Sequence, residues 1–158
     1  MDFEDRIRGM LMGKTFFEAG RVCDLVRLFF RGDGEVALHA RCLVRLVHEG
    51  RLVASSSDAA LPAIDLESES LDGFQWNRGF SAYDFCVKGY LKRTPNGVVT
   101  DVALTPWGDM MLSLDSGASI EILSDSVLRD WEQWRVFHHG ARQTEEHIVR
   151  YPAGYALE

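Results

Sequence analysis

The chain has 158 residues, of which 46% are hydrophobic and 26% are charged, a composition typical of one folded domain and unlike that of a disordered segment. Its formal net charge is −7, and residues 52–77 and 94–128 contain no Lys, Arg or His. Because such acidic stretches repel phosphate backbones and attract basic proteins, direct nucleic-acid binding is disfavoured.

The first half of the chain is predicted to form one helix followed by antiparallel strands. Residues 2–11 carry apolar side chains at helical spacing, with acidic residues in the first turn. Residues 22–30 are rich in strand-forming side chains, and residues 31–34 are predicted to form a turn. Residues 35–47 alternate, so that one apolar face is predicted to contain Val36, Leu38, Ala40, Cys42, Val44 and Leu46.

A tight hairpin and a surface connector are predicted next. Glu49-Gly50 separates two β-rich runs, and glycine supplies the positive φ that a two-residue turn requires, so residues 43–47 and 51–54 are expected to pair. Residues 55–80 are rich in Ser, Asp and Ala and contain Pro62, a composition typical of a connector that crosses the surface.

The second half repeats the order of one helix and several strands. Ser81 is a favourable N-cap with Asp84 three residues later, and Pro95 prevents the helix from continuing past Thr94. A turn is expected near residues 106–109. The predicted strands are residues 98–105, 110–114, 119–123, 133–138 and 147–151.

Short sequence matches indicate that the chain contains the same unit twice, at an offset that falls from 80 to 76 residues. The matching pairs are Arg8-Gly9-Met10-Leu11 with Lys88-Gly89-Tyr90-Leu91, Val22-x-Asp24-Leu25 with Val99-x-Asp101-Val102, Leu38 with Leu114, and Val44-Arg45-Leu46 with Ile120-Glu121-Ile122. Drift of this kind is what changes in loop length between two copies would produce.

The expected fold is α+β, with two pseudo-repeated helix-plus-antiparallel-meander units that share one core, because each unit alone is too small to bury both faces of a sheet. A single domain, 1–158, is predicted. It contains the first unit (1–54), an acidic connector (55–80) and the second unit with an extra C-terminal strand (81–158). If the equivalent strands lie near a twofold axis, Arg45 and Glu121 are expected to form an ion pair that serves stability.

No metal, cofactor or catalytic group is expected. The odd number of widely spaced cysteines, with no CxxC pair, predicts free thiols. His138 and His139 point to opposite faces of a strand, so His147 adds at most a second ligand to either. Ser55-Ser56-Ser57 lies outside a nucleophile turn. No leader pattern opens the chain and no apolar run reaches the roughly 18 residues of a membrane helix, so a cytoplasmic protein is expected.

Two candidate sites follow from the polar and aromatic residues. An aromatic cluster flanked by carboxylates is typical of a hot spot that binds a basic protein, although the same rings would also anchor the connector to the sheet. This partner-binding set is Asp58, Asp65, Glu67, Glu69, Asp72, Phe74 and Trp76. The alternative is a pocket between the two halves, lined by His39, Arg41, Arg45 and Asp58, in which a carboxylate would orient a histidine as a general base.

The stretch Leu38-His39-Ala40-Arg41-Cys42-Leu43-Val44-Arg45-Leu46, followed by a hairpin and by Ser55 and Asp58, resembles an uncharacterised family of short bacterial proteins. In that family a Leu-His-x-x-Cys-x-x-Arg strand leads through a hairpin to a Ser-x-Asp end. Ser119-Ile120-Glu121-Ile122 and Trp134-Arg135-Val136-Phe137 resemble its second-half strands. The resemblance implies an immunity-like protein, which occludes the catalytic domain of a bacterial toxin, and it assigns no catalytic residues.

The sequence therefore predicts a non-enzymatic cytoplasmic binding protein, an immunity protein that neutralises a toxin through an acidic surface. A basic protein partner is expected, with no nucleic acid and no membrane. A small enzyme or ligand-binding protein with a pocket between the halves is the alternative. A structural subunit of a homodimer is a third interpretation.

Overall fold

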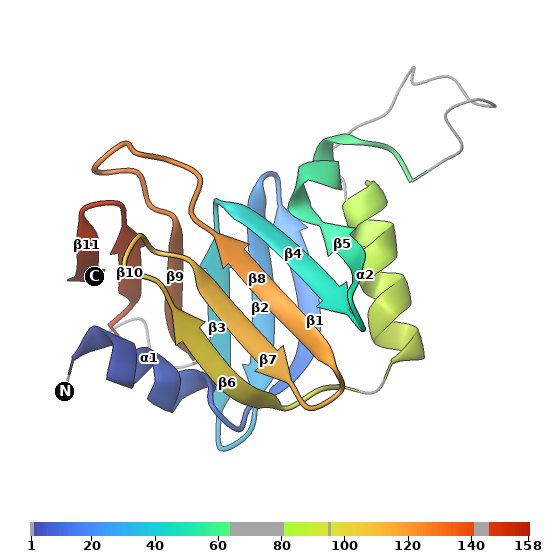
Figure 1. The fold of residues 1–158 in the computed structure, drawn as a ribbon, viewed down its shortest axis with the longest axis horizontal. Coiled ribbons are helices and arrows are strands. Elements are labelled where there is room, and N and C mark those ends of the chain that lie inside the picture. Colours follow the sequence, from blue (N-terminus) through green and yellow to red (C-terminus); the bar gives the residue numbers. More distant parts are fainter. Residues whose placement is uncertain (1, 64–80, 95, 141–145) are drawn as a thin grey trace.

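The computed structural model describes residues 2–63, 81–94, 96–140 and 146–158, which form two antiparallel sheets and two helices (Figure 1). Sheet A contains, in spatial order, β1 (Thr15–Val22), β2 (Leu25–Arg31), β3 (Glu35–Ala40), β9 (Trp134–His139), β10 (Ile148–Tyr151) and β11 (Gly154–Leu157). Sheet B contains β5 (Arg51–Ser55), β4 (Leu43–His48), β8 (Ala118–Leu123), β7 (Met110–Leu114) and β6 (Val99–Leu104). The α+β class expected from the sequence is therefore confirmed, with more of the described residues in strands than in helices.

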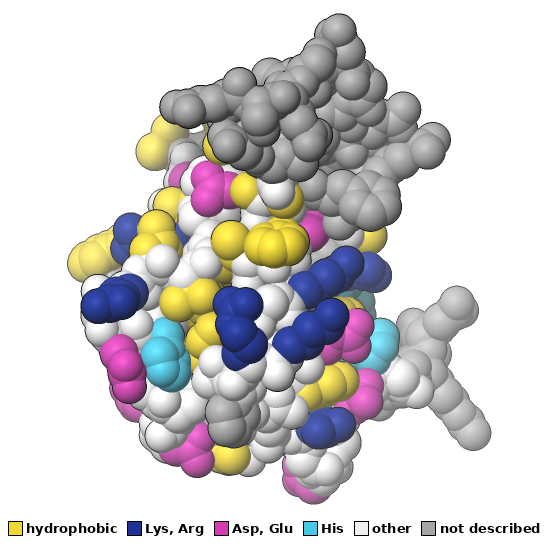
Figure 2. Space-filling model, turned by 90° about the vertical axis from the view of Figure 1, so that its right-hand side faces the viewer, with side chains coloured by type: hydrophobic (Ala, Val, Ile, Leu, Met, Phe, Trp, Pro, Cys, Tyr) yellow, Lys and Arg dark blue, Asp and Glu magenta, His cyan; other side chains and the backbone are white. Residues whose placement is uncertain are grey.

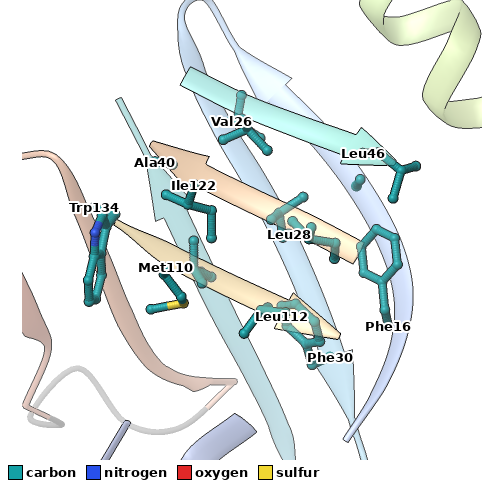
Figure 3. Packing of buried hydrophobic residues seen from close by; sticks show 14 of the residues in the cluster. Phe16, Val26, Leu28, Phe30, Ala40, Leu46, Met110, Leu112, Ile122 and Trp134 are labelled. Atoms are coloured by element: carbon teal, nitrogen blue, oxygen red, sulfur yellow. The ribbon is translucent and has the colours of Figure 1, made fainter. Parts of the chain in front are cut away.

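The inner faces of the two sheets share one hydrophobic core (Figure 3). Phe16, Leu28 and Phe30 project from sheet A toward Met110, Leu112 and Ile122 of sheet B, and all six are nearly or completely buried. Trp134 is fully buried at one end of this layer, where its indole Nε1 donates to the carbonyl of Gly108 at 2.7 Å. The buried Trp therefore satisfies its one polar group.

The predicted alternation over residues 35–47 is present but belongs to two strands in different sheets. The chain leaves sheet A after Ala40 and joins sheet B at Leu43. All of the predicted inward residues are buried: Val36, Leu38, Ala40, Cys42, Val44 and Leu46. The alternation continues through the corner because both strands face the same interior.

The chain changes sheet a second time at residues 124–133, which return it from sheet B to sheet A. This second passage lies directly beside the first, at residues 41–42. The carbonyl oxygen of Gln133 accepts hydrogen bonds from the backbone N–H groups of Arg41, at 2.8 Å, and Cys42, at 3.3 Å. The Gln133 side chain is 1% exposed, and its amide accepts from the Asp125 N–H and donates to the Trp131 carbonyl. One buried glutamine thus holds together the two places at which the chain changes sheet.

The two helices cover the open sides of the sandwich (Figure 1). Helix α1 (Phe3–Leu11) packs beside β6, and the Phe3 ring stacks on Tyr155 of β11 at 5.5 Å between centroids. Helix α2 (Ala82–Arg93) packs against β1, β5 and the 3-10 helix η1 (Ser56–Ala60). Neither helix of the described chain is long and apolar enough to cross a membrane.

The predicted start of α2 is confirmed and carries a buried ion pair. The Ser81 hydroxyl accepts from the Asp84 N–H, while the Asp84 carboxylate accepts from the Ser81 N–H, which is a capping box. Arg21 of β1 binds the same carboxylate through Nε and NH2, at 3.1 and 2.9 Å. Burial alone would raise the pKa of Asp84, but Arg21 and Ser81 lower it below its ordinary value. This cluster fixes α2 to the edge of sheet A.

Several predicted turns are confirmed and two strands were missed. Glu49 and Gly50 have φ angles of 48° and 74°, as the two-residue hairpin between β4 and β5 requires.

The predicted strand 22–30 is wrong at its start, because β1 ends at Val22 and the chain turns at Cys23, where φ is 53°. A bulge in β1 between Phe16 and Glu18 interrupts the alternation that would have shown this strand. Strand β11 follows β10 after a two-residue turn and was not predicted.

The residue equivalence expected at an offset of 76 does not match the sheet positions. Leu38 lies in β3 of sheet A, between β2 and β9, whereas Leu114 lies in β7 of sheet B, between β6 and β8. A different correspondence holds between the strand orders, since β1-β2-β3-β9-β10 has the same connectivity as β6-β7-β8-β4-β5. The β1 bulge also has a counterpart in β6, between Val99 and Asp101.

The expected contact between Arg45 and Glu121 is present. The two residues are directly opposite in the β4–β8 pair, and Arg45 Nε donates to Glu121 Oε2 at 2.7 Å. The Arg45 side chain is 40% exposed, so its guanidinium remains partly hydrated.

We expect each single substitution, Arg45→Met or Glu121→Leu, to cost at most about 1 kcal/mol of unfolding free energy, because exposed ion pairs contribute little. The double variant should lie within about 1 kcal/mol of the original chain, since no charge is then left without its partner. Chemical denaturation of all four proteins measures both the costs and the coupling. A double variant that folds normally but loses an interaction would show that this pair is functional.

Candidate functional site

The predicted partner-binding residues lie mostly outside the described part of the chain. Asp65, Glu67, Glu69, Asp72, Phe74 and Trp76 are all within residues 64–80. Asp58 is described, partly exposed, in η1. The two described ends of this connector meet, because Pro62 and Ser81 form an isolated β-bridge and the Ala82 N–H donates to the Leu61 carbonyl at 2.8 Å.

The exposed surface of α2 beside this connector is basic. Lys88, Lys92 and Arg93 are exposed, and Phe85 is 68% exposed next to them. Figure 2 faces the side of the molecule on which α2 lies and shows Lys and Arg side chains gathered near its middle. The acidic balance of the whole chain therefore does not extend to this face.

The four residues of the alternative pocket are not brought together. His39 projects from the outer face of sheet A, and Arg45 projects from the outer face of sheet B, with the hydrophobic core between them. Arg41 lies at the corner between the sheets and Asp58 in η1. The sequence placed His39 and Arg45 on one strand face, but the corner at residues 41–42 sends them to opposite sides of the sandwich.

A cluster of aromatic and imidazole rings covers the outer face of sheet A. We call it the aromatic face and define it as Arg27 and Phe29 of β2, His39 of β3, Arg135, Phe137 and His139 of β9, and His147 at the start of β10. Phe137 is central: its ring lies 4.9 Å from that of His39, edge to face, and 4.1 Å from that of His147, stacked. His139 packs against Phe29 at 5.1 Å.

Strand register explains why these side chains meet. His39 is directly opposite Arg27 on β2 and Arg135 on β9. Phe29 and Phe137 are both opposite Ala37, whose small side chain leaves room for the two rings. Since cross-strand neighbours on one face are about 5 Å apart, three adjacent strands form a continuous surface of rings.

Two imidazoles of this face, those of His39 and His147, are held in the neutral form. Burial, together with the nearby Arg27 and Arg135 guanidinium groups, lowers the pKa of His39 to about 4. Burial and Arg135 also lower the pKa of His147 below its ordinary value. Because arginine only donates, the contact of 3.0 Å between Arg135 NH1 and His147 Nδ1 requires Nδ1 to accept, which leaves the His147 proton on Nε2.

The two arginines of the face differ in their partners. Arg135 binds Glu132 through two nitrogens, at 2.7 and 2.6 Å, and also approaches Glu158 at 3.2 Å. Burial would raise the pKa of Glu132, but Arg135 lowers it below its ordinary value. Within the described residues, the buried Nε of Arg27 has no hydrogen-bond partner. Whereas Arg135 pairs with Glu132 and Glu158, Arg27 forms no ion pair within the described residues, so it is the cation of this face to which an external anion can bind.

No described element lies over the aromatic face. The element contacts within residues 2–63, 81–94, 96–140 and 146–158 place α1 beside β6 and α2 beside β1, β5 and η1. The face is thus a flat surface of rings with one donor that lacks a partner. Such a surface can stack on apolar or aromatic groups and accept an anion at Arg27.

No group of three His, Cys, Asp or Glu within the described residues is arranged to hold a metal ion. The three cysteines are free, and burial raises the pKa of Cys42 to about 12, so its thiol remains protonated at neutral pH.

Sequence reasoning missed the aromatic face because it assigned His39 to a pocket between the halves and considered His138, His139 and His147 only as metal ligands. The sequence did contain a signal, which is the alternation of inward and outward side chains along each strand. In Trp134–His139 the inward positions are Trp134 and Val136, and the outward ones are Arg135, Phe137 and His139. An outward row with rings in place of small or charged residues indicates a surface with a function.

The chain matches no family model, and no curated protein or solved structure is similar to it.

The low pKa of His39 predicts a specific loss of stability in acid. The unfolded chain binds a proton at His39 near pH 6.5, whereas the folded chain does so only near pH 4. The stability that the folded chain owes to this difference is therefore complete above pH 6.5 and is lost as the pH falls toward 4. Urea denaturation from pH 7 to pH 5 should therefore show a shallower pH dependence in His39→Gln than in the original chain. An NMR titration of the His39 ring with a midpoint near 6.5 would contradict this expectation.

Proposed function

We propose that the protein is a non-enzymatic binding protein that recognises another protein through the aromatic face of sheet A. The observation that carries this proposal is a row of Phe and His rings on a sheet face over which the described residues place no helix. Aromatic rings and arginine are the side chains that dominate binding energy at protein interfaces.

The partner is proposed to combine an apolar patch with a carboxylate. The rings of Phe29, Phe137 and His39 are rigid and lose little conformational entropy when a partner packs on them. The neutral state of His39 and His147 avoids the cost of desolvating two further charges. Arg27 lacks a partner for its buried Nε, so a carboxylate of the partner fits it better than an ammonium group does.

A photo-crosslinking amino acid at position 139, which is exposed and lies on this face, tests the proposal in cells. We expect one discrete crosslinked product, and we expect Arg27→Glu to lower its yield at least about tenfold because it replaces the donor by a repelling charge. The matched control places the same crosslinker at Met111, 43% exposed on sheet B, and should give no such product. Equal yields of crosslinked product at positions 139 and 111 would contradict the proposal.

As a separate proposal, which rests on the acidic stretch and not on the aromatic face, the protein is an immunity-type inhibitor that acts in the cytoplasm on a toxin with a basic surface. Its support comes from the sequence, where Asp65, Glu67, Glu69 and Asp72 lie in a stretch without any basic residue. Negative charges in such a row accelerate the encounter with a basic partner and select it against others.

Co-expression with the product of the neighbouring gene tests this form. We expect the two proteins to co-purify, and charge reversal of the four carboxylates to Lys should weaken the complex at least about tenfold. Reversal of Asp101 and Asp130, which are exposed elsewhere, is the matched control and should have a smaller effect. If the complex survives charge reversal of the four acidic residues, the acidic stretch does not bind the toxin.

We also propose that the fold arose by duplication, with strands exchanged between the halves. The correspondence that supports this places Phe16 with Val99, Leu38 with Ile120, and Leu46 with Val136. The helices are exchanged between the halves in the same way, because α1 lies beside β6 of the second half and α2 beside β1 of the first. The offset of 76 instead aligned β3 with β7 and β4 with β8, in each case the strand before the counterpart proposed here.

A further inference from the structure

A cavity of about 550 Å³ opens between α1 and the ends of the strands in sheet A. Its apolar part is formed by Met10 of α1 and Ile148 of β10. Its polar part includes Lys14, which precedes β1, Asp33 in the turn between β2 and β3, and His138 near the end of β9. The volume is in the range of sites for small organic ligands.

The corresponding space beside α2 is filled by a tyrosine of the chain itself. Tyr90 is 6% exposed, and its hydroxyl lies 2.9 Å from His48 Nδ1, with the two ring centroids 5.5 Å apart. Burial raises the pKa of the Tyr90 phenol, and the neighbouring Ser116 and Thr94 side chains partly oppose that shift. A phenol is therefore held by a histidine, close to a turn residue and to the residue that ends the helix.

Strand register shows that the two places correspond. His138 is opposite Val36 in the β3–β9 pair, as His48 is opposite Ala118 in the β4–β8 pair. Asp33 lies in the β2–β3 turn and Ser116 in the β7–β8 turn.

The helices correspond as well. Met10 has the position in its helix that Tyr90 has in the other, within Arg8-Gly9-Met10-Leu11 and Lys88-Gly89-Tyr90-Leu91. The cavity is thus the place from which a phenol ring is missing because methionine replaces tyrosine.

We propose that this cavity binds the phenol group of an external ligand. The ring packs between Met10 and Ile148, and the hydroxyl is bound among Lys14, His138 and Asp33, of which the last two hold the places of His48 and Ser116 around Tyr90. This site is distinct from the aromatic face and does not depend on its function.

The charges around the cavity favour a neutral ligand. Lys14 is 6% exposed and pairs with Asp33, and Arg6 pairs with Glu146 at 3.3 Å. Each cation already has a carboxylate, so a ligand carboxylate would have to compete with an existing ion pair. A phenol instead donates one hydrogen bond and accepts another without any net charge.

Binding of 4-methylphenol, followed by NMR of the Met10 methyl group, tests the proposal. We expect saturable shifts with a dissociation constant of about 0.1 to 10 mM, given the small size of the probe. Toluene lacks the hydroxyl and should bind at least about tenfold more weakly, since the hydrogen bonds between the hydroxyl and the cavity are then lost. Equal binding of the two probes, or no saturation by 4-methylphenol, would overturn the assignment.

Two variants test the correspondence itself. Met10→Tyr should fill the cavity, raise Tm and abolish 4-methylphenol binding, whereas Met12→Tyr, at a residue 44% exposed just after the helix, should leave binding intact. Tyr90→Met should lower Tm, and 4-methylphenol should restore part of the loss by occupying the vacated space. Unchanged binding in Met10→Tyr, or no rescue of Tyr90→Met, would refute the inference even if the other variant failed to fold.

Discussion

The constraint on which the structure depends is that the chain changes sheet twice at one place. Arg41 and Cys42 carry the first passage, and their N–H groups donate to the carbonyl of Gln133, which ends the second. Because Gln133 is buried, each of these bonds replaces water that cannot enter, and a lost partner would leave an unsatisfied polar group in the interior. The pairing of β3 with β9 and of β4 with β8 follows from this junction.

The exchange of strands between the two halves explains how so short a chain buries the inner faces of both sheets. Each sheet combines strands from both halves, so neither half can bury its inner face without the other. The helices are used at the open sides, where α1 stacks Phe3 on Tyr155 and α2 is fixed by the pair of Arg21 and Asp84. As a result, no described helix is left to cover the outer face of sheet A, and its rings remain available to a partner.

Two surfaces with different chemistry result from one architecture. The aromatic face lies over the central strands, where His39 and His147 stay neutral beside arginines that are already hydrogen-bonded or partly buried. The cavity under α1 lies at the strand ends, where Met10 leaves unfilled the space that Tyr90 fills beside α2. Flat rings suit contact with a large partner, and an enclosed space with paired charges suits a small neutral group.

Local physics let the sequence determine both helices, the Glu49-Gly50 turn and the inward row from Val36 to Leu46. Caps, glycine turns and alternation act within a few residues, so the sequence alone reveals them. The aromatic face depended on the corner at Arg41, because a change of sheet reverses which molecular surface an outward side chain reaches. That corner is set by hydrogen bonds to Gln133, more than 90 residues away, and no local pattern encodes it.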